Sequence, residues 1–321
     1  MTARRLGEDR SLLHALAERY EFKPYRNYRV LSRQRQSAVL CAELDRAMAG
    51  PDSVTTVAGS GNAEAVAVCR LLPWDSQFFG VRMARLDYVL RAGAGDRTAI
   101  GDAVAAAVEW CRAKGVQHVA ARLDVADTSA IYALEDQAFR LMDALVTYIY
   151  HPKRPPPPRV KEVGTLRPFE PSDTDEIIEI TREAYQGFRG RFHLDPHLPQ
   201  QRSDELYIEW ARQCCAGRMA DRIFVSEDSR GRLHGWASVR LVEPVSSTGG
   251  VRIFAGSLGA CRRDRPGAYA GLIRAAAAEN HAAGAVTEAQ TQNYNFPTVR
   301  VYEAVGAQYV RADYTFHAWL D

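Results

Sequence analysis

The chain has 321 residues, of which 46% are hydrophobic and 25% are charged, and its formal net charge is +2. This length suggests two domains of about 100 to 200 residues each, and the composition is ordinary for a globular protein. Lys and Arg are spread along the chain without a basic stripe, which disfavours nucleic acid as a partner. No apolar run reaches the roughly 18 to 20 residues that span a bilayer, so we expect no membrane partner.

Residues 1–10 lack the apolar core of a signal peptide, so the sequence predicts a cytoplasmic protein. The six cysteines form no Cys-x-x-Cys pair, and no histidine cluster lies beside them in the sequence. We therefore expect reduced, mostly structural thiols and no metal site.

The clearest boundary in the chain is the run of four prolines at 155–158. Proline has no backbone N–H and favours an extended polyproline conformation. The sequence therefore predicts an exposed linker over 152–162, between a first domain at 1–151 and a second domain at 163–321.

Hydrophobic periodicity and glycine stops predict mixed helices and strands in both domains. In the first domain we expect a helix over 12–19, strands over 53–57, 65–71 and 84–90, a helix over 100–114, a strand over 116–123, a helix over 129–139 and a strand over 144–150.

In the second domain we expect a strand over 165–169, helices over 172–185 and 204–214, strands over 222–226, 235–242 and 250–260, a helix over 271–282, a strand over 285–292, a helix over 296–305 and a strand over 308–319. Both halves thus end in helix–strand–helix–strand, at a separation of roughly 168 residues. The predicted fold class is α/β with a mixed sheet, built as a tandem repeat.

The order of elements in the second half, together with residues 264–269, resembles the GNAT acetyltransferases. Their cofactor motif has the form Arg/Gln-x-x-Gly-x-Gly/Ala. Gly267 matches the first glycine, whereas Asp264 stands at the first position and Tyr269 at the last. A turn that opens a helix directs free N–H groups at an anion. The resemblance therefore implies that the pyrophosphate of an acyl-CoA, acetyl-CoA above all, is bound by Arg263, Arg265, Gly267, Ala268 and Tyr269. A plain surface turn with basic residues is the alternative.

A second signal lies in 291–307, which is similar to the family's pattern of an Asn followed by a helix that carries a Tyr and by a Gly. The resemblance implies that Asn295 shapes the cofactor site. It also implies that Tyr302 is the general acid that protonates the leaving thiolate. Packing of the helix by an ordinary aromatic residue is the alternative for Tyr302.

Three further stretches resemble one branch of the family, the dTDP-fucosamine acetyltransferases that act on nucleotide-linked amino sugars. These stretches are 72–80, then 188–195 with 206–210, and the ending 314–319.

The internal repeat tests which half carries the chemistry. When Asp127 is aligned with Asn295, Leu134 falls opposite Tyr302, and leucine has no proton to give. Residues 91–95 are the nearest approach to a glycine turn in the first half. We therefore expect a partial, non-catalytic GNAT-like unit followed by a complete catalytic domain.

The implied reaction is direct attack of an amine on a thioester, which needs a neutral amine, donors for the oxyanion and a proton for the thiolate. By the resemblance, the oxyanion donors are backbone N–H groups of Leu258, Gly259 and Ala260, where two strands separate. His193, Glu288 and a water chain are the candidate bases. For His193, contact with the acceptor or a structural role is favoured; for Glu288, a solvated strand face is favoured.

Candidate residues for the acceptor site come from both halves. Packing in the core is the alternative for the aromatic ones, local backbone bonds for the aspartate, and solvated loops for the arginines. The set comprises Trp74, Asp75, Phe79, Arg189, Arg191 and His193.

The sequence as a whole predicts an acetyl-CoA-dependent N-acetyltransferase that acts on a nucleotide-linked amino sugar without a covalent intermediate. Its predicted partners are a small-molecule amine, as the substrate, and a second copy of the chain, in a homodimer. An N-acyltransferase for another small-molecule amine, for example in natural-product biosynthesis, is one alternative. The other is a GNAT-like protein that binds an acyl-CoA or a partner without turnover.

Overall fold

The computed structural model describes residues 3–7, 10–59, 64–91, 97–161 and 163–320. The chain forms two compact units: unit 1 is Met1–Ala144 with Ala312–Asp321, and unit 2 is Leu145–Arg311. Most of the glycine turn suggested at 91–95 lies outside the described residues. Within those residues, no helix is both long and apolar enough to cross a bilayer.

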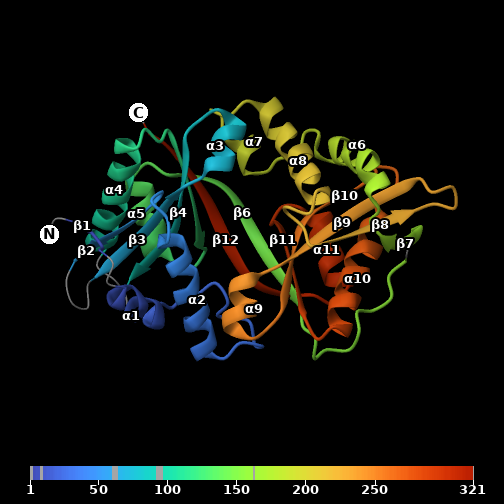
Figure 1. Ribbon diagram of the computed structural model, residues 1–321, viewed down its shortest axis with the longest axis horizontal. Helices are drawn as coiled ribbons and strands as arrows, with labels where there is room; N and C mark the ends of the chain where they lie inside the picture. The colour runs from blue at the N-terminus through green and yellow to red at the C-terminus, as the bar shows by residue number, and fades with distance from the viewer. Residues whose placement is uncertain (1–2, 8–9, 60–63, 92–96, 162, 321) are drawn as a thin grey trace. The chain divides into compact units, whose positions relative to one another are not determined.

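Unit 1 is a mixed sheet with helices on both faces (Figure 1). Its strands run in the order β1-β2-β3-β4-β5-β12. Its elements are β1 (Arg4–Arg5), α1 (Ser11–Arg19), α2 (Arg33–Met48), β2 (Ser53–Ala58), β3 (Ala65–Leu71), α3 (Pro73–Phe79), β4 (Met83–Arg91), α4 (Arg97–Ala113), β5 (His118–Asp124), α5 (Thr128–Asp136) and the second part of β12 (Gln308–Trp319).

Alternation along β3 shows why this sheet is covered on both sides. Ala65, Ala67 and Cys69 pack with α4 and α5, whereas Val66 and Val68 pack with α1 and α2. Because side chains alternate between the faces of a strand, a continuous apolar run marks a strand that is buried on both faces.

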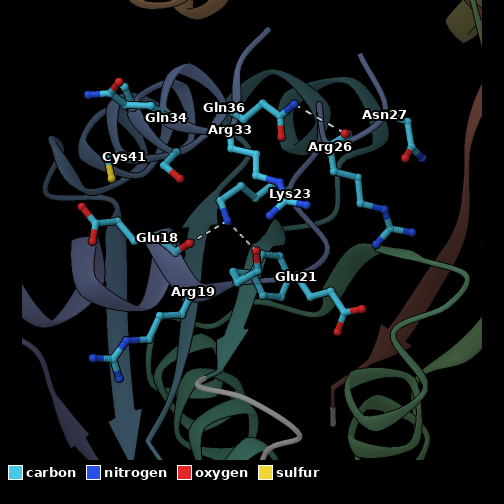
Figure 2. Close-up of a pocket in the computed structure, with 13 residues that line it drawn as sticks. Glu18, Arg19, Glu21, Lys23, Arg26, Asn27, Arg33, Gln34, Gln36 and Cys41 are labelled. Carbon is cyan, nitrogen blue, oxygen red and sulfur yellow. Dashed lines mark hydrogen bonds between the residues drawn. The ribbon is translucent and has the colours of Figure 1, made fainter. Parts of the chain in front are cut away.

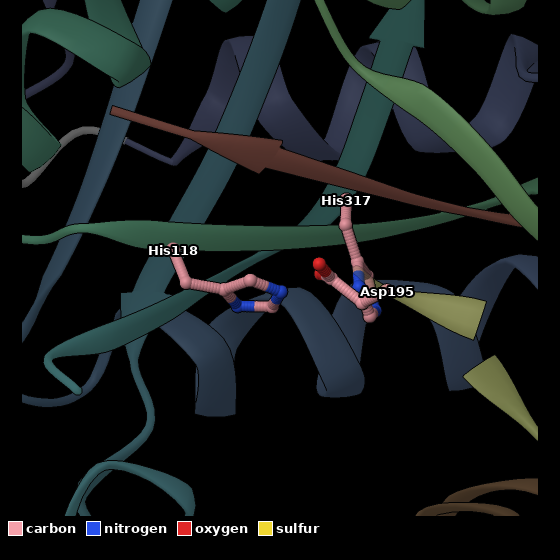
Figure 3. A group of neighbouring side chains, drawn as sticks. All are labelled: His118, Asp195 and His317. Atoms are coloured by element: carbon pink, nitrogen blue, oxygen red, sulfur yellow. The ribbon is translucent and has the colours of Figure 1, made fainter. Parts of the chain in front are cut away.

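A pair of buried histidines belongs to the same unit. The rings of His118 on β5 and His317 on β12 lie edge to face with centroids 4.4 Å apart (Figure 3). Trp319 packs on His118 at 5.3 Å. These aromatic contacts lie next to the strand pairing of β12 with β5, which runs from Asp313 opposite Asp124 to Trp319 opposite His118.

Unit 2 has the strand order β6-β11-β10-β9-β8-β7. One face carries α6 and α8 with the buried Trp236, and the other carries α10. Its elements are the second part of β6 (Arg140–Tyr150), β7 (Thr165–Pro168), η2 (Pro171–Asp173), α6 (Thr174–Tyr185), α7 (Arg191–Leu194), α8 (Gln200–Cys215), β8 (Arg222–Glu227), β9 (Leu233–Leu241), α9 (Glu243–Gly249), β10 (Ile253–Cys261), α10 (Gly267–Ala282), β11 (Val286–Gln292), α11 (Phe296–Ala304) and the first part of β12.

The last strand of each half pairs in the sheet of the other unit. Residues 145–150 of β6 pair antiparallel with 287–292 of β11 in unit 2, and β12 pairs with β5 in unit 1. The units therefore differ from the predicted domains 1–151 and 163–321 at both ends. The linker prolines do lie in a stretch between β6 and β7 that has no helix or strand. The unit to which a strand belongs, however, is decided by the strand it pairs with and not by its position relative to the linker.

The predicted repeat is more extensive than four elements. From β3 to β6 and from β9 to β12 the two halves show the same order of strands and helices. Asp127 and Asn295 precede the matching helices α5 and α11 with the same backbone angles, φ −83° and ψ 63°. This agreement supports the sequence alignment that placed Leu134 opposite Tyr302.

Four helices were missed by the sequence analysis: α2, α3, α7 and α9. Of these, α3 and α9 have a shared signal, because each has a proline in its first turn and ends at a left-handed glycine, Gly80 or Gly250, at φ 68° and 64°. Proline at the start and glycine at the end are ordinary helix boundaries. They went unnoticed because both helices are only about two turns long.

The exchange of strands predicts which fragment folds. A fragment of residues 145–311 keeps every pairing within unit 2, whereas 163–321 lacks β6 and exposes the edge of β11. Because a strand that loses its partner exposes backbone groups and promotes aggregation, we expect 145–311, in which β6 still pairs with β11, to fold better and to stay more soluble than 163–321. Size-exclusion chromatography and circular dichroism of both fragments measure this. Equal solubility and folding of 163–321 would contradict it.

Candidate active site

The two central strands of unit 2 separate part-way along their length. β10 and β11 pair in parallel only from Ile253 opposite Val286 to Ala255 opposite Glu288. On its other side β10 pairs with β9 both before and beyond this point, and β11 pairs with β6 from Thr287 to Gln292. The later residues of β10 therefore have no strand partner on the β11 side in the described pairings, as the resemblance implied.

A bulge in β10 accompanies the separation. The register against β9 shifts between Gly256 and Gly259. Ser238 on β9 holds the bulge, because its hydroxyl donates to the Leu258 carbonyl at 2.8 Å and accepts from the Leu258 N–H at 3.0 Å. Of the three predicted oxyanion donors, the amide of Leu258 is thus already engaged. Ala260 is paired with Trp236 on β9, two residues before the hydrogen bond from the Arg262 N–H to the His234 carbonyl, so its N–H also points toward β9. Gly259 is therefore the remaining candidate donor.

Gly259 lies in a crowded position that only glycine fits well. A Cβ placed there would lie 3.0 Å from the Trp236 carbonyl oxygen and 3.2 Å from the Tyr269 ring. The Gly259 carbonyl accepts a 3.0 Å hydrogen bond from the Tyr185 hydroxyl at the end of α6. Backbone atoms of β10 are therefore in direct contact with two tyrosines.

Tyr302 on α11 lies on the β11 side of the separation. Its side chain is 3% exposed, and its hydroxyl donates to the Gln290 carbonyl at 3.2 Å. Burial raises the pKa of Tyr302 well above its ordinary value, and the neighbouring Tyr269 raises it further. The phenol is consequently neutral, and able to donate a proton, throughout the physiological range.

Tyr269 on α10 connects the two strands. It shares a side-chain hydrogen bond with Tyr302, and its ring lies against Gly259. Burial also raises the pKa of Tyr269. The residue that departs from the family motif therefore contacts the proposed acid directly, a role that the motif comparison did not suggest.

Asn295 lies at the junction of β11 and α11. Its side-chain amide donates to the Thr291 hydroxyl at 2.9 Å, and its backbone carbonyl accepts a hydrogen bond from the Val299 N–H. Asn295 thus fixes the start of the helix that carries Tyr302.

The start of α10 is the predicted pyrophosphate site. A Cβ at Gly267 would lie 2.9 Å from the Val163 side chain, so glycine is needed there for packing as well. The Arg263 guanidinium donates to the Gln186 carbonyl at 3.2 Å. Arg265 is exposed and contacts Asp264. Ala268 is buried in the first turn. Both predicted cations, Arg263 and Arg265, are exposed.

A residue that sequence analysis missed is Arg262. Its side chain is buried, donates to the Leu233 carbonyl at 2.8 Å and pairs with Glu176 at 2.7 Å. Glu179 and Glu183, on the same face of α6, lie at 3.5 and 3.8 Å. The spacing of these acids at helical intervals was the available signal. Arg262 attaches α6 to the end of β10.

His193 forms a pair with an aspartate that sequence analysis did not single out. Its Nε2 lies 3.1 Å from Asp204 Oδ1, and its side chain is 3% exposed. The imidazole stacks on Tyr207 at 5.8 Å, and Tyr207 stacks on Tyr185 at 4.2 Å. Nδ1 is buried and has no hydrogen-bond partner among the described residues. A buried imidazole held by a carboxylate is an arrangement suited to accepting a proton.

Glu288, the other candidate base, does not lie on a solvated strand face. The sequence analysis favoured a solvated strand face for Glu288, and this is wrong, because Glu288 is 8% exposed. It lies at the last parallel pair of β10 and β11, where both faces of the sheet are covered.

Besides His193, two acceptor candidates lie in unit 2. The Arg189 carbonyl accepts a hydrogen bond from the Tyr294 hydroxyl, and Arg191 lies over the Phe192 ring at 4.4 Å. Arg189 is exposed, as the solvated-loop alternative expected.

The remaining three candidates lie on α3 in unit 1. Trp74 is half-buried and stacks on Phe78 at 5.7 Å. Phe79 is buried, as expected from core packing, and Asp75 lies in the first turn of the helix.

Unit 1 repeats the strand geometry without the acid. β4 and β5 pair in parallel only from Met83 to Leu86, and the register of β3 against β4 shifts at Val68/Cys69. Leu134, at the position that matches Tyr302, is 0% exposed and belongs to the core.

No family model matches the chain. The spore coat polysaccharide biosynthesis protein SpsD of Bacillus subtilis (strain 168) is 28% identical over 161 residues, which are 48% of this chain and 50% of that protein. The chain thus spans about half the length of this curated relative.

Solved structures match nearly the whole chain. A GCN5-related N-acetyltransferase from Sphaerobacter thermophilus has a TM-score of 0.60 at 15% identity, over 99% of this chain and 95% of that one. A tandem GNAT protein from the clavulanic acid biosynthesis pathway has a TM-score of 0.57 at 16% identity, over 99% and 98%. A glucosamine N-acetyltransferase region of a fungal multi-domain enzyme has a TM-score of 0.61 at 14% identity, over 98% and 38%. The predicted fold class is therefore confirmed: the chain has the tandem GNAT N-acetyltransferase fold.

Proposed function

We propose that the chain is an acyl-CoA-dependent N-acetyltransferase whose chemistry is carried by unit 2. The observation that carries this proposal is the placement of the neutral, buried Tyr302 hydroxyl. This hydroxyl donates a hydrogen bond to the Gln290 carbonyl on β11, and it contacts Tyr269, whose ring lies beside Gly259 on β10. Both contacts are at the point where the two strands separate.

The donor would be acetyl-CoA or another acyl-CoA. Its pyrophosphate would lie at the start of α10, where N–H groups and the helix dipole favour an anion and Arg265 adds an exposed cation. Gly267, Ala268 and Arg263 would complete this end of the site. The Gly259 N–H, which does not point toward β9, would stabilise the charge that develops on the thioester oxygen.

The reaction balances with the groups present. The amine nitrogen bonds to the thioester carbon, and the carbon–sulfur bond breaks. A base takes one proton from the amine, and Tyr302 gives one proton to the thiolate. We assign the base to His193, directly or through water, because Asp204 orients its imidazole and Nδ1 is left to accept a proton.

For the acceptor we propose the amine of a nucleotide-linked amino sugar, as in the dTDP-fucosamine branch. The relative SpsD is named for polysaccharide biosynthesis, which supports a sugar substrate. Arg189 and Arg191 would meet its diphosphate, and Trp74, Asp75 and Phe79 are proposed as further acceptor residues. Unit 1, with Leu134 in place of the acid, would be non-catalytic.

Another small-molecule amine is the second candidate acceptor, since a matching tandem GNAT structure belongs to a natural-product pathway. A binding protein without turnover is the third candidate. The departures at Asp264 and Tyr269 favour it, whereas the presence of Asn295 and Tyr302 favours the enzyme.

The Tyr302→Phe variant tests the proposed acid. It removes the hydroxyl and keeps the ring, so we expect kcat to fall by about 10² or more while acetyl-CoA still binds. Release of free CoA, measured against a panel of nucleotide-linked amino sugars and simple amines, reports the rate. Tyr309→Phe, at a tyrosine that is 55% exposed, is the matched control and should keep the wild-type rate. Full activity of Tyr302→Phe would rule out its role as the acid, and a folded protein that binds acetyl-CoA but acetylates no amine would favour the binding protein.

The Tyr269→Phe variant tests the contact between the two tyrosines. Tyr269 raises the pKa of Tyr302, so removing its hydroxyl should lower that pKa. A general acid works below its pKa and fails above it. The alkaline fall in kcat should therefore move to lower pH, by up to about one unit for the loss of one hydrogen bond. An unchanged pH–rate profile would mean that Tyr269 only packs against Gly259.

A further inference from the structure

Unit 1 contains a cleft of about 990 Å³ that the proposed chemistry does not use (Figure 2). It lies between the end of α1, the loop that follows and the first turns of α2. This volume is at the upper end of the range for pockets that hold small molecules.

Cations outnumber acids in the lining of this cleft. Arg19, Lys23, Arg26 and Arg33 line it, against Glu18 and Glu21. Arg26 is neutralised by Asp124, whose carboxylate lies 3.0 Å away. Among the ion pairs of the described residues, none includes Arg19, Lys23 or Arg33.

Two of these cations come together. In Figure 2 the side chains of Lys23 and Arg33 converge from two different segments, while Glu18 and Glu21 extend to either side. Burial lowers the pKa of Lys23, and the nearby Arg33 charge acts in the same direction, whereas Cys41 and Glu18 act against it. The positive charges of Lys23 and Arg33 repel each other at close range. An anion bound between them would offset this electrostatic repulsion.

The position of Lys23 is fixed in advance. Its ammonium donates to the carbonyls of Glu18 at 2.8 Å and Tyr20 at 2.6 Å, which end α1. An ammonium has three N–H donors, so one remains for a ligand. The side chain is therefore ordered by backbone carbonyls, and among the described residues no carboxylate forms an ion pair with it, although the Glu18 charge is near enough to raise the pKa of Lys23.

The first turn of α2 adds to the positive charge. It carries Arg33 and Arg35 and no acid, although acids are normally preferred there because of the helix dipole. Ser32 caps the helix by accepting from the Arg35 N–H at 3.3 Å. Arg33 lines the cleft, whereas Arg35 does not.

We propose that this cleft binds a phosphate-bearing small molecule, with the phosphate held between Lys23 and Arg33. A phosphate matches the two cations in charge, and a guanidinium can donate to two of its oxygens at once. Gln34 adds an amide to the lining for the rest of the molecule. The residues that line this cleft all belong to unit 1, and none of them lies at the start of α10.

Titration calorimetry of the full chain with inorganic pyrophosphate tests this site. We expect millimolar or tighter binding to the wild type and affinity lowered by about tenfold or more in Arg33→Gln, as for a charge-assisted hydrogen bond. Arg35→Gln removes the same charge from the same turn outside the cleft and should change the affinity by less than about twofold. Circular dichroism checks that the exposed substitutions leave the fold intact.

A second variant separates this cleft from the proposed pyrophosphate site of unit 2. Arg265→Glu should leave the pyrophosphate affinity that depends on Arg33 unchanged. Equal losses in Arg33→Gln and Arg35→Gln would show only general attraction to positive charge and overturn the proposal. Binding lost in Arg265→Glu and kept in Arg33→Gln would assign the ligand to α10, and no binding by a folded wild type would also overturn the proposal.

Discussion

The separation of β10 from β11 is the constraint on which the arrangement of unit 2 depends. Parallel pairing ends at Ala255 and Glu288, and beyond this point β10 keeps only its pairing with β9, across the bulge held by Ser238. A strand in the middle of a sheet normally uses its backbone groups on both sides. Here one side is left without a neighbouring strand, and the side chains of α6, α10 and α11 meet there. The proposed chemistry follows from this break in the sheet.

Three tyrosines line the break, and each hydroxyl has a defined contact. Tyr185 donates to Gly259 on β10, Tyr302 donates to Gln290 on β11, and Tyr269 lies between them. Buried phenols are tolerated when their hydroxyls are hydrogen-bonded, and burial keeps them neutral. The protein thus holds a proton donor in place without a buried charge. Unit 1 has the same break and bulge, but there Leu134 fills the matching position with an apolar side chain.

Much of this could be predicted from the sequence because it depends on local patterns. The elements of the repeat, the fold class and the separation of the two strands all follow from periodicity or from the family resemblance. The exchange of β6 and β12 between the units could not be predicted, because the residues of one strand do not indicate which distant strand it will pair with. The same holds for Asp204 beside His193, for Arg262 beneath α6 and for the contact of Tyr269 with Tyr302. These depend on where side chains of separate helices meet, and motif spacing does not contain that information.

The central claim is that an acyl-CoA binds in unit 2 at the separated strands, and hydrogen exchange with mass spectrometry tests it most directly. Peptides of the full chain would be compared with and without acetyl-CoA, before any acceptor is known. We predict slower exchange in 256–269 and 290–302, and no change in the matching segment 84–91 of unit 1. Protection confined to unit 1, or no protection anywhere at millimolar acetyl-CoA in a folded protein, would contradict the claim.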